Sequence, residues 1–422
     1  MSIKHLYEDE RPTLLLDFAN SKTLDPRITF TRNSIATYVD EQGILRTAAA
    51  NEARFDHDGT GECRGLLLEQ ARTNLIVHSE AFNNNTYWGK GAGFNLVGSQ
   101  PDPAGGTNAF LLEEINGNAG GKNVSTTGPI AWSGSHLTIS FYVKSVNRPY
   151  VGLGVSGLFQ SNVSISLVDG TVGTQESNVI DAAGEYVGGG WWRCWARYNN
   201  TSTNVSPQVF IASDDGSITM PTGETGHGLV IYGGQMEESA YVTSYIPTSG
   251  STVQRVSDVF NISGNNFSSW YNPIESTMVV NMSCKNSTGY GMLWGFYGGK
   301  RIEGFPGFQT PFEGLAFFLG DNNTQKYLGR AGAGGATWNQ DHEIEKCAYS
   351  WDFSSGEGTA CISGNFAPNP PPATGVPVTT ITGGFRLMGG QNASNVLNTG
   401  IVSSVAYYNT RLSDATLEAL TK

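Results

Sequence analysis

Short apolar runs separated by polar turns recur along most of the 422-residue chain. Many of these runs, such as 137–143 and 163–167, alternate apolar and polar residues with a period of two, which is typical of half-buried antiparallel strands. Residues 38–45 predict a hairpin, since Asp-Glu-Gln-Gly lies between two apolar ends. Glycine is abundant, at 54 residues, and Asn, Ser and Thr fill the spaces between the runs. The pattern predicts an all-β fold.

The length exceeds the usual size of a single core, so we expect more than one domain. The evenly spaced strands between 73 and 248 predict a jelly-roll sandwich, and a new series of strands after it predicts a second sandwich. A short helix is expected at the C-terminus, with Ser413 as its N-cap and Asp414 in its first turn. The predicted units are an N-terminal arm (1–26), whose first ten residues are either a docking peptide or a frayed terminus, a jelly roll (27–255) and a second antiparallel sandwich (256–422).

Composition and charge exclude several classes of partner. Charged residues make up 15% of the chain and its net charge is −12, whereas binding to a phosphate backbone requires clustered Lys and Arg. No apolar run approaches the roughly 18 residues that a membrane-spanning helix needs, and the first ten residues contain no apolar leader segment. We therefore expect neither a nucleic-acid partner nor membrane insertion.

The cysteines do not form a recognisable framework. Their odd number and the absence of Cys-x-x-Cys spacing fit neither a zinc site nor a set of disulfides. We expect Cys194 and Cys347, which lie in strand-like runs, to behave as small buried hydrophobic residues, in a protein that folds in a reducing cytoplasm. The five cysteines are Cys63, Cys194, Cys284, Cys347 and Cys361.

Two segments far apart in the sequence carry its most specific motifs. Residues 27–74 contain FTRNSIATYVD, ARFD and CRGLLLEQARTN, and residues 235–258 contain TSYIPTSGSTVQRVSD. Together these segments resemble the opening and closing signatures of a β-sandwich module in bacteriophage and prophage tail and fibre proteins. Within them, we expect the Arg72-Thr73-Asn74 triplet and Arg255 to join the opening segment to the closing strand by hydrogen bonds.

Further resemblances concern the fold. The strand that contains Gly190-Trp191-Trp192-Arg193 and the strand at 233–237 resemble those of carbohydrate-binding-module jelly rolls. The part of the chain after Phe260 is similar to concanavalin A-like or laminin-G-like sandwiches, in which a final strand precedes a short helix.

These resemblances imply a virion protein on the phage tail or head surface, assembled in the host cytoplasm. The role they favour is a tail fibre or receptor-binding protein that adheres to host surface glycans, acts as a homotrimer and contacts other virion proteins. One alternative is a capsid-bound head fibre or decoration protein with a structural role. The other alternative is a glycan depolymerase.

Aromatic residues in predicted polar loops are the candidates for glycan binding. Aromatic rings stack on the apolar faces of pyranoses, while polar side chains bind the hydroxyl groups. The alternative is that a ring covers the edge of a core, which we expect for Trp191, Trp192 and Trp195. The candidate glycan-binding residues are Tyr87, Trp88, Trp270, Tyr271 and Trp338.

Two oxygen-rich turns are candidates for calcium. Calcium takes six to eight oxygen ligands, although turns select Asp and Asn without any metal. The candidate ligands are Asp214, Asp215, Asp321 and Asn323, and no other cofactor is predicted.

No catalytic residues are predicted. The chain has no Gly-x-Ser-x-Gly elbow and no His-x-x-x-His spacing. A glycosidase needs two carboxylates about 5–10 Å apart, whereas Glu237 and Glu238 are adjacent in a strand and point to opposite faces. The Asp56-His57-Asp58 run is expected in a turn, where the resembled module has a variable loop. We therefore expect a protein without enzymatic activity.

Overall fold

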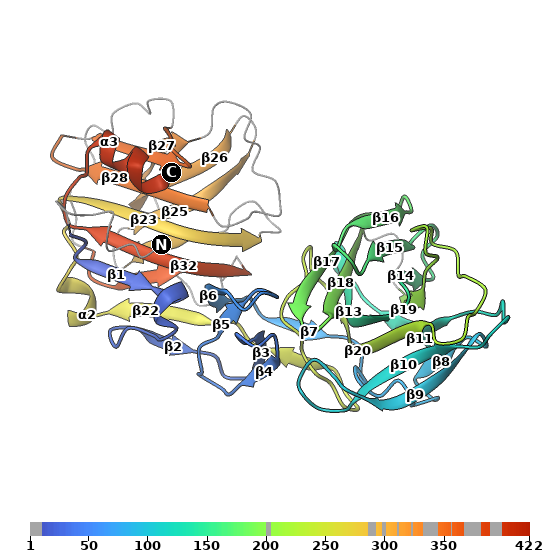
Figure 1. Ribbon diagram of the computed structural model, residues 1–422. Helices are drawn as coiled ribbons and strands as arrows, with labels where there is room; N and C mark the ends of the chain where they lie inside the picture. Colours follow the sequence, from blue (N-terminus) through green and yellow to red (C-terminus); the bar gives the residue numbers. More distant parts are fainter. Residues whose placement is uncertain are drawn as a thin grey trace.

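The chain forms two β-sandwiches that lie side by side in the computed structural model (Figure 1). All pairings among the described strands are antiparallel, and helix α3 (Asp414–Thr421) ends the chain, so the predicted all-β fold with two sandwiches is confirmed. Ser413 caps α3 as predicted, because its side chain accepts a hydrogen bond from the Thr416 N–H. The structure describes residues 11–199, 204–285, 293–297, 301–309, 312–321, 324–331, 345–355, 357–366, 381–388 and 399–422.

The jelly-roll sandwich is built from the middle of the chain. On strand β13, Leu137, Ile139 and Phe141 point into its core, while the alternate residues face away from it. One sheet has the order β17 (Val179–Gly188), β18 (Trp191–Asn199), β13 (His136–Val146), β20 (Gly228–Glu237), β10 (Ala109–Glu114) and β9 (Phe94–Gln100). The other has the order β16 (Val172–Gln175), β15 (Val163–Ser166), β14 (Tyr150–Ser156), β19 (Asn204–Ile211), β11 (Asn123–Thr126) and β8 (Trp88–Lys90), with β12 (Ile130–Ala131) beside β19.

The second sandwich combines both ends of the chain, and we call it the composite sandwich. One sheet has the order β30 (Asn365–Phe366), β29 (Glu357–Ile362), β28 (Glu345–Asp352), β23 (Glu275–Lys285), β32 (Thr399–Tyr408), β6 (Cys63–Leu68) and β5 (Phe55–His57), with β1 (Leu14–Asp17) also beside β32. The other has the order β2 (Thr29–Thr31), β22 (Val259–Ser263), β31 (Gly384–Leu387), β24 (Trp294–Tyr297), β25 (Arg301–Gln309), β26 (Phe312–Asp321) and β27 (Thr324–Ala331). Two one-turn helices, α1 (Phe18–Ser21) and α2 (Asn265–Ser268), pack against it.

Strand pairing divides the chain differently from the predicted boundaries at residues 27 and 256. Strands β1 and β6 pair with β32, and β2 pairs with β22, so the described opening residues belong to the composite sandwich. The physical reason is burial: Leu14 and Leu16 of β1, and Leu66 of β6, contribute to the same core as the C-terminal strands. The jelly roll is therefore inserted between two parts of the composite sandwich.

The outer face of one jelly-roll sheet is partly covered by the predicted hairpin. Strands β3 (Ala36–Val39) and β4 (Leu45–Ala48) pair as expected, and Val39 and Leu45 pack against Tyr142 and Trp191 of the jelly roll. Gly43, in the hairpin turn, has a positive φ of 73°, and a Cβ there would lie 2.8 Å from the Val187 carbonyl oxygen. Glycine is therefore required where the hairpin meets the jelly roll.

The two stretches of chain that connect the sandwiches are paired with each other. Strand β7 (Arg72–Asn74) is antiparallel to β21 (Val253–Arg255), which confirms the predicted link between opening and closing segments. The Asn74 side chain adds a hydrogen bond of 2.8 Å to the Ile246 carbonyl.

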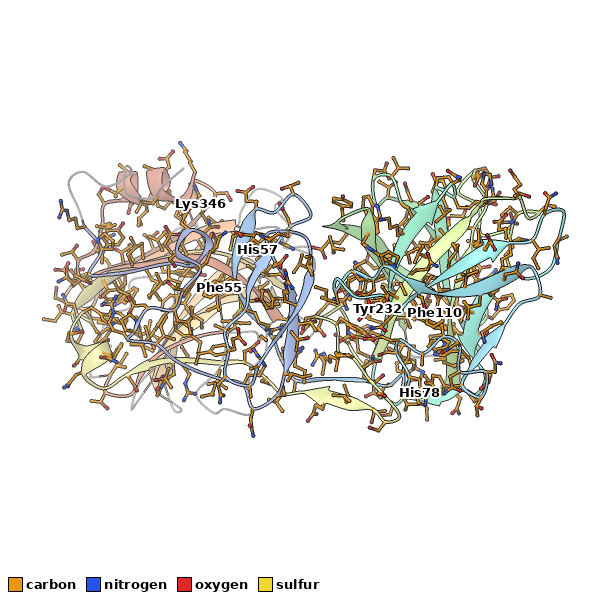
Figure 2. The ribbon with its side chains drawn as sticks, turned by 60° about the horizontal axis from the view of Figure 1, so that its bottom comes forward. Phe55, His57, His78, Phe110, Tyr232 and Lys346 are labelled. Carbon is orange, nitrogen blue, oxygen red and sulfur yellow. The ribbon has the colours of Figure 1, made fainter. Side chains whose placement is uncertain are left out.

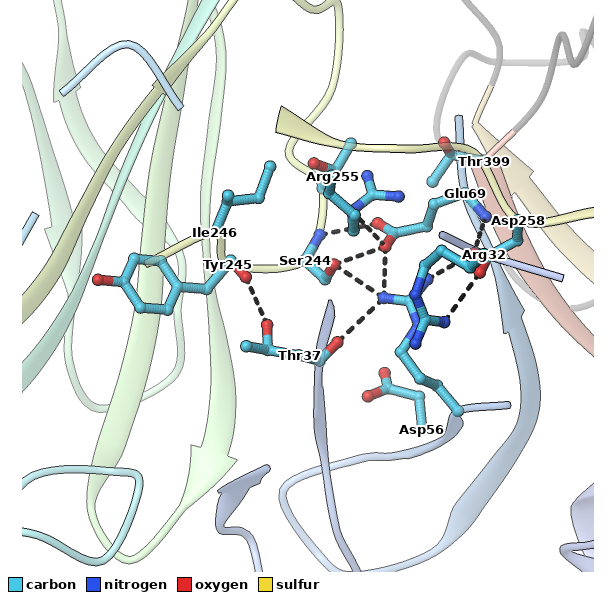
Figure 3. Close-up of polar contacts among 12 residues, drawn as sticks. Arg32, Thr37, Asp56, Glu69, Ser244, Tyr245, Ile246, Arg255, Asp258 and Thr399 are labelled. Carbon is cyan, nitrogen blue, oxygen red and sulfur yellow. Dashed lines mark hydrogen bonds and ion pairs between the residues drawn. The ribbon is translucent and has the colours of Figure 1, made fainter. Parts of the chain in front are cut away.

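A buried ion-pair network lies beside this link (Figure 3), and we call it the joint. The Arg54 guanidinium is 2.7 Å from Glu69 and 2.6 Å from Asp258, and Arg32 is 3.0 Å from Asp258. Arg255 is 3.4 Å from Glu69. Burial alone would lower the pKa of Arg54, but the carboxylates of Asp258 and Glu69 outweigh it and raise that pKa. The joint consists of Arg32, Arg54, Glu69, Arg255 and Asp258.

The joint also reaches the jelly-roll side. Glu69 accepts hydrogen bonds from the Ser244 backbone N–H at 2.7 Å and from its hydroxyl at 2.5 Å. Arg54 donates to the Thr37 carbonyl, and the Thr37 hydroxyl donates to the Tyr245 carbonyl at 2.6 Å (Figure 3). The joint therefore links the hairpin and the closing segment to the composite sandwich.

All five cysteines are buried, as expected for Cys194 and Cys347. Within the described part of the chain, none of the helices has the length and apolar character to cross a membrane.

We predict that Arg54→Met lowers the free energy of unfolding by about 3–5 kcal/mol, because it leaves buried carboxylate charge without its main partner. Urea unfolding measures this loss. The matched control is Lys22→Met, which breaks an exposed pair with Glu41 and should change stability by no more than about 0.5 kcal/mol. Equal stabilities of the two variants would contradict a structural role for the joint.

Candidate functional site

A cleft of about 120 Å³ opens where the two sandwiches and the hairpin meet, and we call it the inter-sandwich cleft. Figure 2 shows His57 and Tyr232 on the sides of the two sandwiches that face each other. The cleft is lined by side chains from both sandwiches and by the segment 242–245 that closes the jelly roll. At the roughly 30 Å³ that each water occupies in the liquid, it has room for about four waters.

The jelly-roll wall of the cleft comes from the outer face of one sheet. Because strand residues alternate between faces, the core positions Phe141 and Cys194 leave Tyr142 and Arg193 on the opposite face, toward the cleft. Glu185 of β17 lies directly across from Arg193 in the strand register. This wall therefore carries an aromatic ring, a guanidinium and a carboxylate.

The opposite wall comes from the composite sandwich. Strand β5 supplies Asp56 and His57, and β6 supplies Arg64, whose guanidinium is 2.7 Å from the Glu185 carboxylate on the other wall. This ion pair spans the two sandwiches, with both side chains partly exposed. The prediction that Asp56-His57-Asp58 forms a turn is wrong. Phe55–His57 form strand β5, and the turn begins only at Asp58.

Asp56 is an uncompensated carboxylate. Its Oδ1 accepts a hydrogen bond of 2.9 Å from the Val39 N–H, and no ion pair joins it to another described residue. Burial raises the pKa of Asp56 to about 6, and the nearby Glu185 carboxylate adds to the rise, although the Val39 hydrogen bond opposes it. A carboxylate held in this way in a cleft is typical of a functional site.

His57 adds a second unused acceptor. Its Nδ1 lies 3.0 Å from the Val39 carbonyl oxygen, and because a carbonyl only accepts, Nδ1 carries the proton. In the neutral imidazole Nε2 is then an acceptor, and it has no hydrogen-bond partner among the described residues. Both unused acceptors therefore come from the same short strand.

Arg193 supplies a donor without a partner on the jelly-roll wall. Its guanidinium lies 5.4 Å from the centroid of the Tyr142 ring and makes a hydrogen bond of 3.3 Å to the Ser140 hydroxyl. Its Nε has no partner in the described part of the chain. The cleft thus presents acceptors on one wall and donors on the other, an arrangement suited to a ligand rich in polar groups.

The predicted glycan-binding residues of the jelly roll do not line the cleft. Trp88 is 1% exposed and lies in the jelly-roll core, where its Nε1–H donates to the His78 carbonyl at 2.8 Å. Tyr87 is half-buried beside it, and its hydroxyl accepts from the Val77 N–H at 3.1 Å. In this structure Trp88 has no exposed face on which a sugar could stack.

The other predicted aromatic residues lie elsewhere. Trp270 is 4% exposed in the core of the composite sandwich, and Tyr271 stacks on Phe267 with ring centroids 4.7 Å apart. Both follow α2, at the end of the composite sandwich away from the jelly roll (Figure 1). Trp338 lies outside the described residues. Trp191 and Trp195 are buried, as expected, and Trp192 is partly buried against the core.

The predicted calcium ligands are not brought together in the described part of the chain. Asp214 is 2.8 Å from the buried guanidinium of Arg148, and Asp215 accepts the Ser217 N–H within its own turn. Asp321 ends strand β26 and its side chain is not described, while Asn323 lies outside the described residues. No group of three His, Cys, Asp or Glu side chains suited to a metal occurs among the described residues, and calcium binding stays a prediction.

The sequence contains signals for the residues that line the cleft. Arg193 alternates with Trp192 and Cys194, so the period of two alone places it on the face opposite the core. Phe55-Asp56-His57 also alternates, but the run is short and precedes a Gly-rich turn, which favours the interpretation as a loop. No local signal indicates that these two strands face each other.

Comparison with known proteins yields distant structural similarities only. No protein-family model matches the chain, and no curated protein matches it. Among solved structures, the Ruminococcus gnavus IT-sialidase CBM40 bound to alpha2,6 sialyllactose is 16% identical, with 35% of this chain and 84% of that chain covered and a TM-score of 0.28. The same module bound to alpha2,3 sialyllactose is 17% identical over 35% of this chain and 84% of its own, also with a TM-score of 0.28.

A further similarity is to the Trypanosoma rangeli sialidase in complex with the inhibitor DANA. It is 10% identical, covers 74% of this chain and 60% of that chain, and has a TM-score of 0.24. These examples are a carbohydrate-binding module and a sialidase, but at these TM-scores the similarity assigns neither a ligand nor an activity to this chain.

We predict that Asp56→Asn stabilises the protein at neutral pH. The folded-state pKa is raised from the ordinary 3.8 to about 6, so ionisation of Asp56 removes stability as the pH rises through this interval. At pH 7.5 the free energy of unfolding of the variant should exceed that of wild type by about 1–3 kcal/mol. The lower part of this range applies if solvent in the cleft screens the Asp56 charge. Below pH 4 the gain should disappear, as measured by calorimetry at several pH values.

The matched control for this prediction is Asp58→Asn. Hydrogen bonds from Thr60 and Glu62 outweigh burial and lower the pKa of Asp58, so its replacement should bring no gain at pH 7.5. Equal Tm values for wild type and Asp56→Asn at pH 7.5 would contradict an uncompensated charge at Asp56.

Proposed function

We propose that this protein binds saccharides in the inter-sandwich cleft. The observation that carries the proposal is the pair of uncompensated polar groups on its two walls, Asp56 on one and Arg193 on the other. Sugar hydroxyls donate and accept hydrogen bonds, so one saccharide can satisfy both groups at once.

The remaining lining supports the same ligand class. Tyr142, Val39 and Val187 provide apolar surface beside the polar groups, and the hydroxyls of Thr243 and Thr399 lie on other parts of the wall. A site of this mixed character suits the alternating C–H and O–H groups of a pyranose. The burial of Trp88 and Trp270 moves the proposed site away from the aromatic loops, but it leaves the proposed ligand class unchanged.

We further propose that the protein acts on the surface of a phage particle as a tail fibre or receptor-binding protein. The resemblance of residues 27–74 and 235–258 to phage fibre modules supports this location. Several weak sugar sites on one oligomer, a trimer for example, would then give a high overall affinity for the host surface. This adhesion would require no catalysis. A head fibre or decoration protein is the alternative supported by the same motifs.

We predict saturable binding of the purified protein to a subset of glycans on an array. Asp56→Asn should weaken binding about tenfold, because a hydrogen bond to a charged group contributes about 1.5–3 kcal/mol. Since this variant is expected to be more stable than wild type, the loss cannot be ascribed to unfolding. Asp169→Asn, an exposed turn carboxylate outside the cleft, is the matched control and should bind as wild type does.

The same samples test for cleavage, since Asp56 and Glu185 both line the cleft. Mass spectrometry of the bound glycan should find it intact after prolonged incubation. Cleavage that is lost in Asp56→Asn and Glu185→Gln would replace the binding proposal with a depolymerase. Absence of binding to every glycan, for a protein of confirmed oligomeric state, would overturn saccharide recognition.

We predict that antibodies raised against the purified protein label intact phage particles of the source prophage or phage. Immunogold electron microscopy distinguishes the two locations, since label on the tail supports a receptor-binding protein and label on the capsid supports a head fibre. Particles that bind no antibody, when the protein is present in the lysate, would exclude both.

A further inference from the structure

We propose that the saccharide recognised in the inter-sandwich cleft is anionic and that Arg193 binds its carboxylate or sulfate group. The inference rests on the proposed function and narrows its ligand to acidic saccharides. It follows from the way in which Arg193 is held and from the absence of a charge partner for it among the described residues.

Arg193 is a buried cation with little hydrogen bonding to the described chain. The residue is 8% exposed and lines the cleft, its one hydrogen bond to a described side chain is the 3.3 Å contact with Ser140, and its Nε has no partner among the described residues. No described carboxylate lies within ion-pair distance of it. Burial of an unpaired charge is costly, so its presence calls for a partner that the described chain does not supply.

Other buried arginines of the described chain have carboxylate partners. Arg54 is paired with Glu69 and Asp258, and Arg148 lies 2.8 Å from Glu114. Isolation of Arg193 is therefore a local feature of the cleft and not a general property of this fold.

The strand register gives Arg193 a neighbouring acid with which it does not pair. Glu185 lies directly opposite Arg193 on the neighbouring strand, where cross-strand pairs of opposite charge commonly form. Its carboxylate is instead 2.7 Å from Arg64 of the composite sandwich. The nearest cross-strand acid is thus engaged across the cleft, and the Arg193 guanidinium is left for a ligand.

The environment of Arg193 suits a carboxylate or sulfate. The guanidinium plane packs near the Tyr142 ring, at 5.4 Å from its centroid, and this contact limits its rotation. A fixed guanidinium presents parallel N–H groups that match the two oxygens of a carboxylate or sulfate, and such charge-assisted bonds are stronger than neutral ones.

The other charges of the cleft restrict which anions fit. Asp56 faces the same space and repels a bare anion, whereas hydroxyl groups would donate to it. An acidic saccharide carries both groups, with hydroxyls for Asp56 and an acid for Arg193. Inorganic sulfate or acetate carries only the acid and should compete poorly.

The test compares acidic oligosaccharides with the same oligosaccharides after reduction of the carboxyl to an alcohol, by isothermal titration calorimetry on the full chain. Wild type should bind the acidic form at least about tenfold more tightly. Equal affinity for the two forms would overturn the inference while leaving the proposed function in place. Binding of neither form, nor of a sulfated oligosaccharide, would instead contradict the proposed function.

Variants locate the effect at Arg193. Arg193→Met should weaken binding of the acidic form by about tenfold or more and weaken binding of the reduced form clearly less, while the affinity of Arg193→Lys for the acidic form should fall between those of wild type and Arg193→Met. Arg46→Met, an exposed hairpin residue outside the cleft, is the control and should match wild type. Equal loss for acidic and reduced forms in Arg193→Met, with Tm unchanged, would also overturn the inference.

Titration with a sulfated oligosaccharide distinguishes binding of a sulfate group from binding of a carboxylate. Preference for the carboxylate or for the sulfate form would identify the group that Arg193 binds. Displacement of the acidic saccharide by millimolar inorganic sulfate or acetate would show a general anion site and overturn the saccharide-specific form of the inference.

Discussion

The joint is the interaction on which the arrangement of the two sandwiches depends. The jelly roll is inserted into the composite sandwich, so the chain passes between them twice, at β7 and at β21. Backbone pairing of two three-residue strands alone would leave the sandwiches free to reorient. The joint adds buried ion pairs between residues on both sides of the insertion, since Glu69 precedes it and Asp258 follows it. Because Glu69 also accepts two hydrogen bonds from Ser244 in the segment that closes the jelly roll, this buried geometry favours one relative position of the sandwiches.

The cleft is a consequence of that position. One jelly-roll sheet would otherwise expose the outer face of β13, β18 and β20, and the hairpin and the closing segment cover only part of it. The joint and the inter-sandwich cleft differ in whether their charged groups are paired. In the joint, Arg54 and Glu69 compensate each other, whereas in the cleft Asp56 and Arg193 remain uncompensated. Compensation favours stability, and its absence at Asp56 lowers stability at neutral pH, as is common where a protein keeps groups ready for a ligand.

The sequence predicts the local structure well and the long-range structure poorly. Period-two alternation and turn residues were sufficient for the strands, the hairpin at 38–45 and the cap at Ser413, because each depends on neighbours in the chain. The pairing of β1 with β32 joins residues almost at opposite ends of the chain, and no local pattern specifies it. Trp88 shows the same limit for the site, since the polar sequence around it suggests a surface loop although the ring fills the jelly-roll core. Asp56 and Arg193 are each unremarkable in sequence and acquire meaning only when the fold places them on one cleft.

The motifs that resemble phage fibre modules coincide with the joint more than with the proposed ligand site. The residues of these motifs that hold the sandwiches together are Arg32, Arg54, Glu69, Asn74, Ser244, Arg255 and Asp258. Of the two uncompensated groups, Asp56 lies within them, whereas Arg193 lies on a jelly-roll strand outside them. The motifs therefore describe how the jelly roll is attached, and under the proposed function the outer face of that jelly roll selects the ligand. On this basis a chain can retain the attachment and change its ligand by substitution on β17 and β18 alone, without disturbing the ion pairs that set the geometry of the cleft.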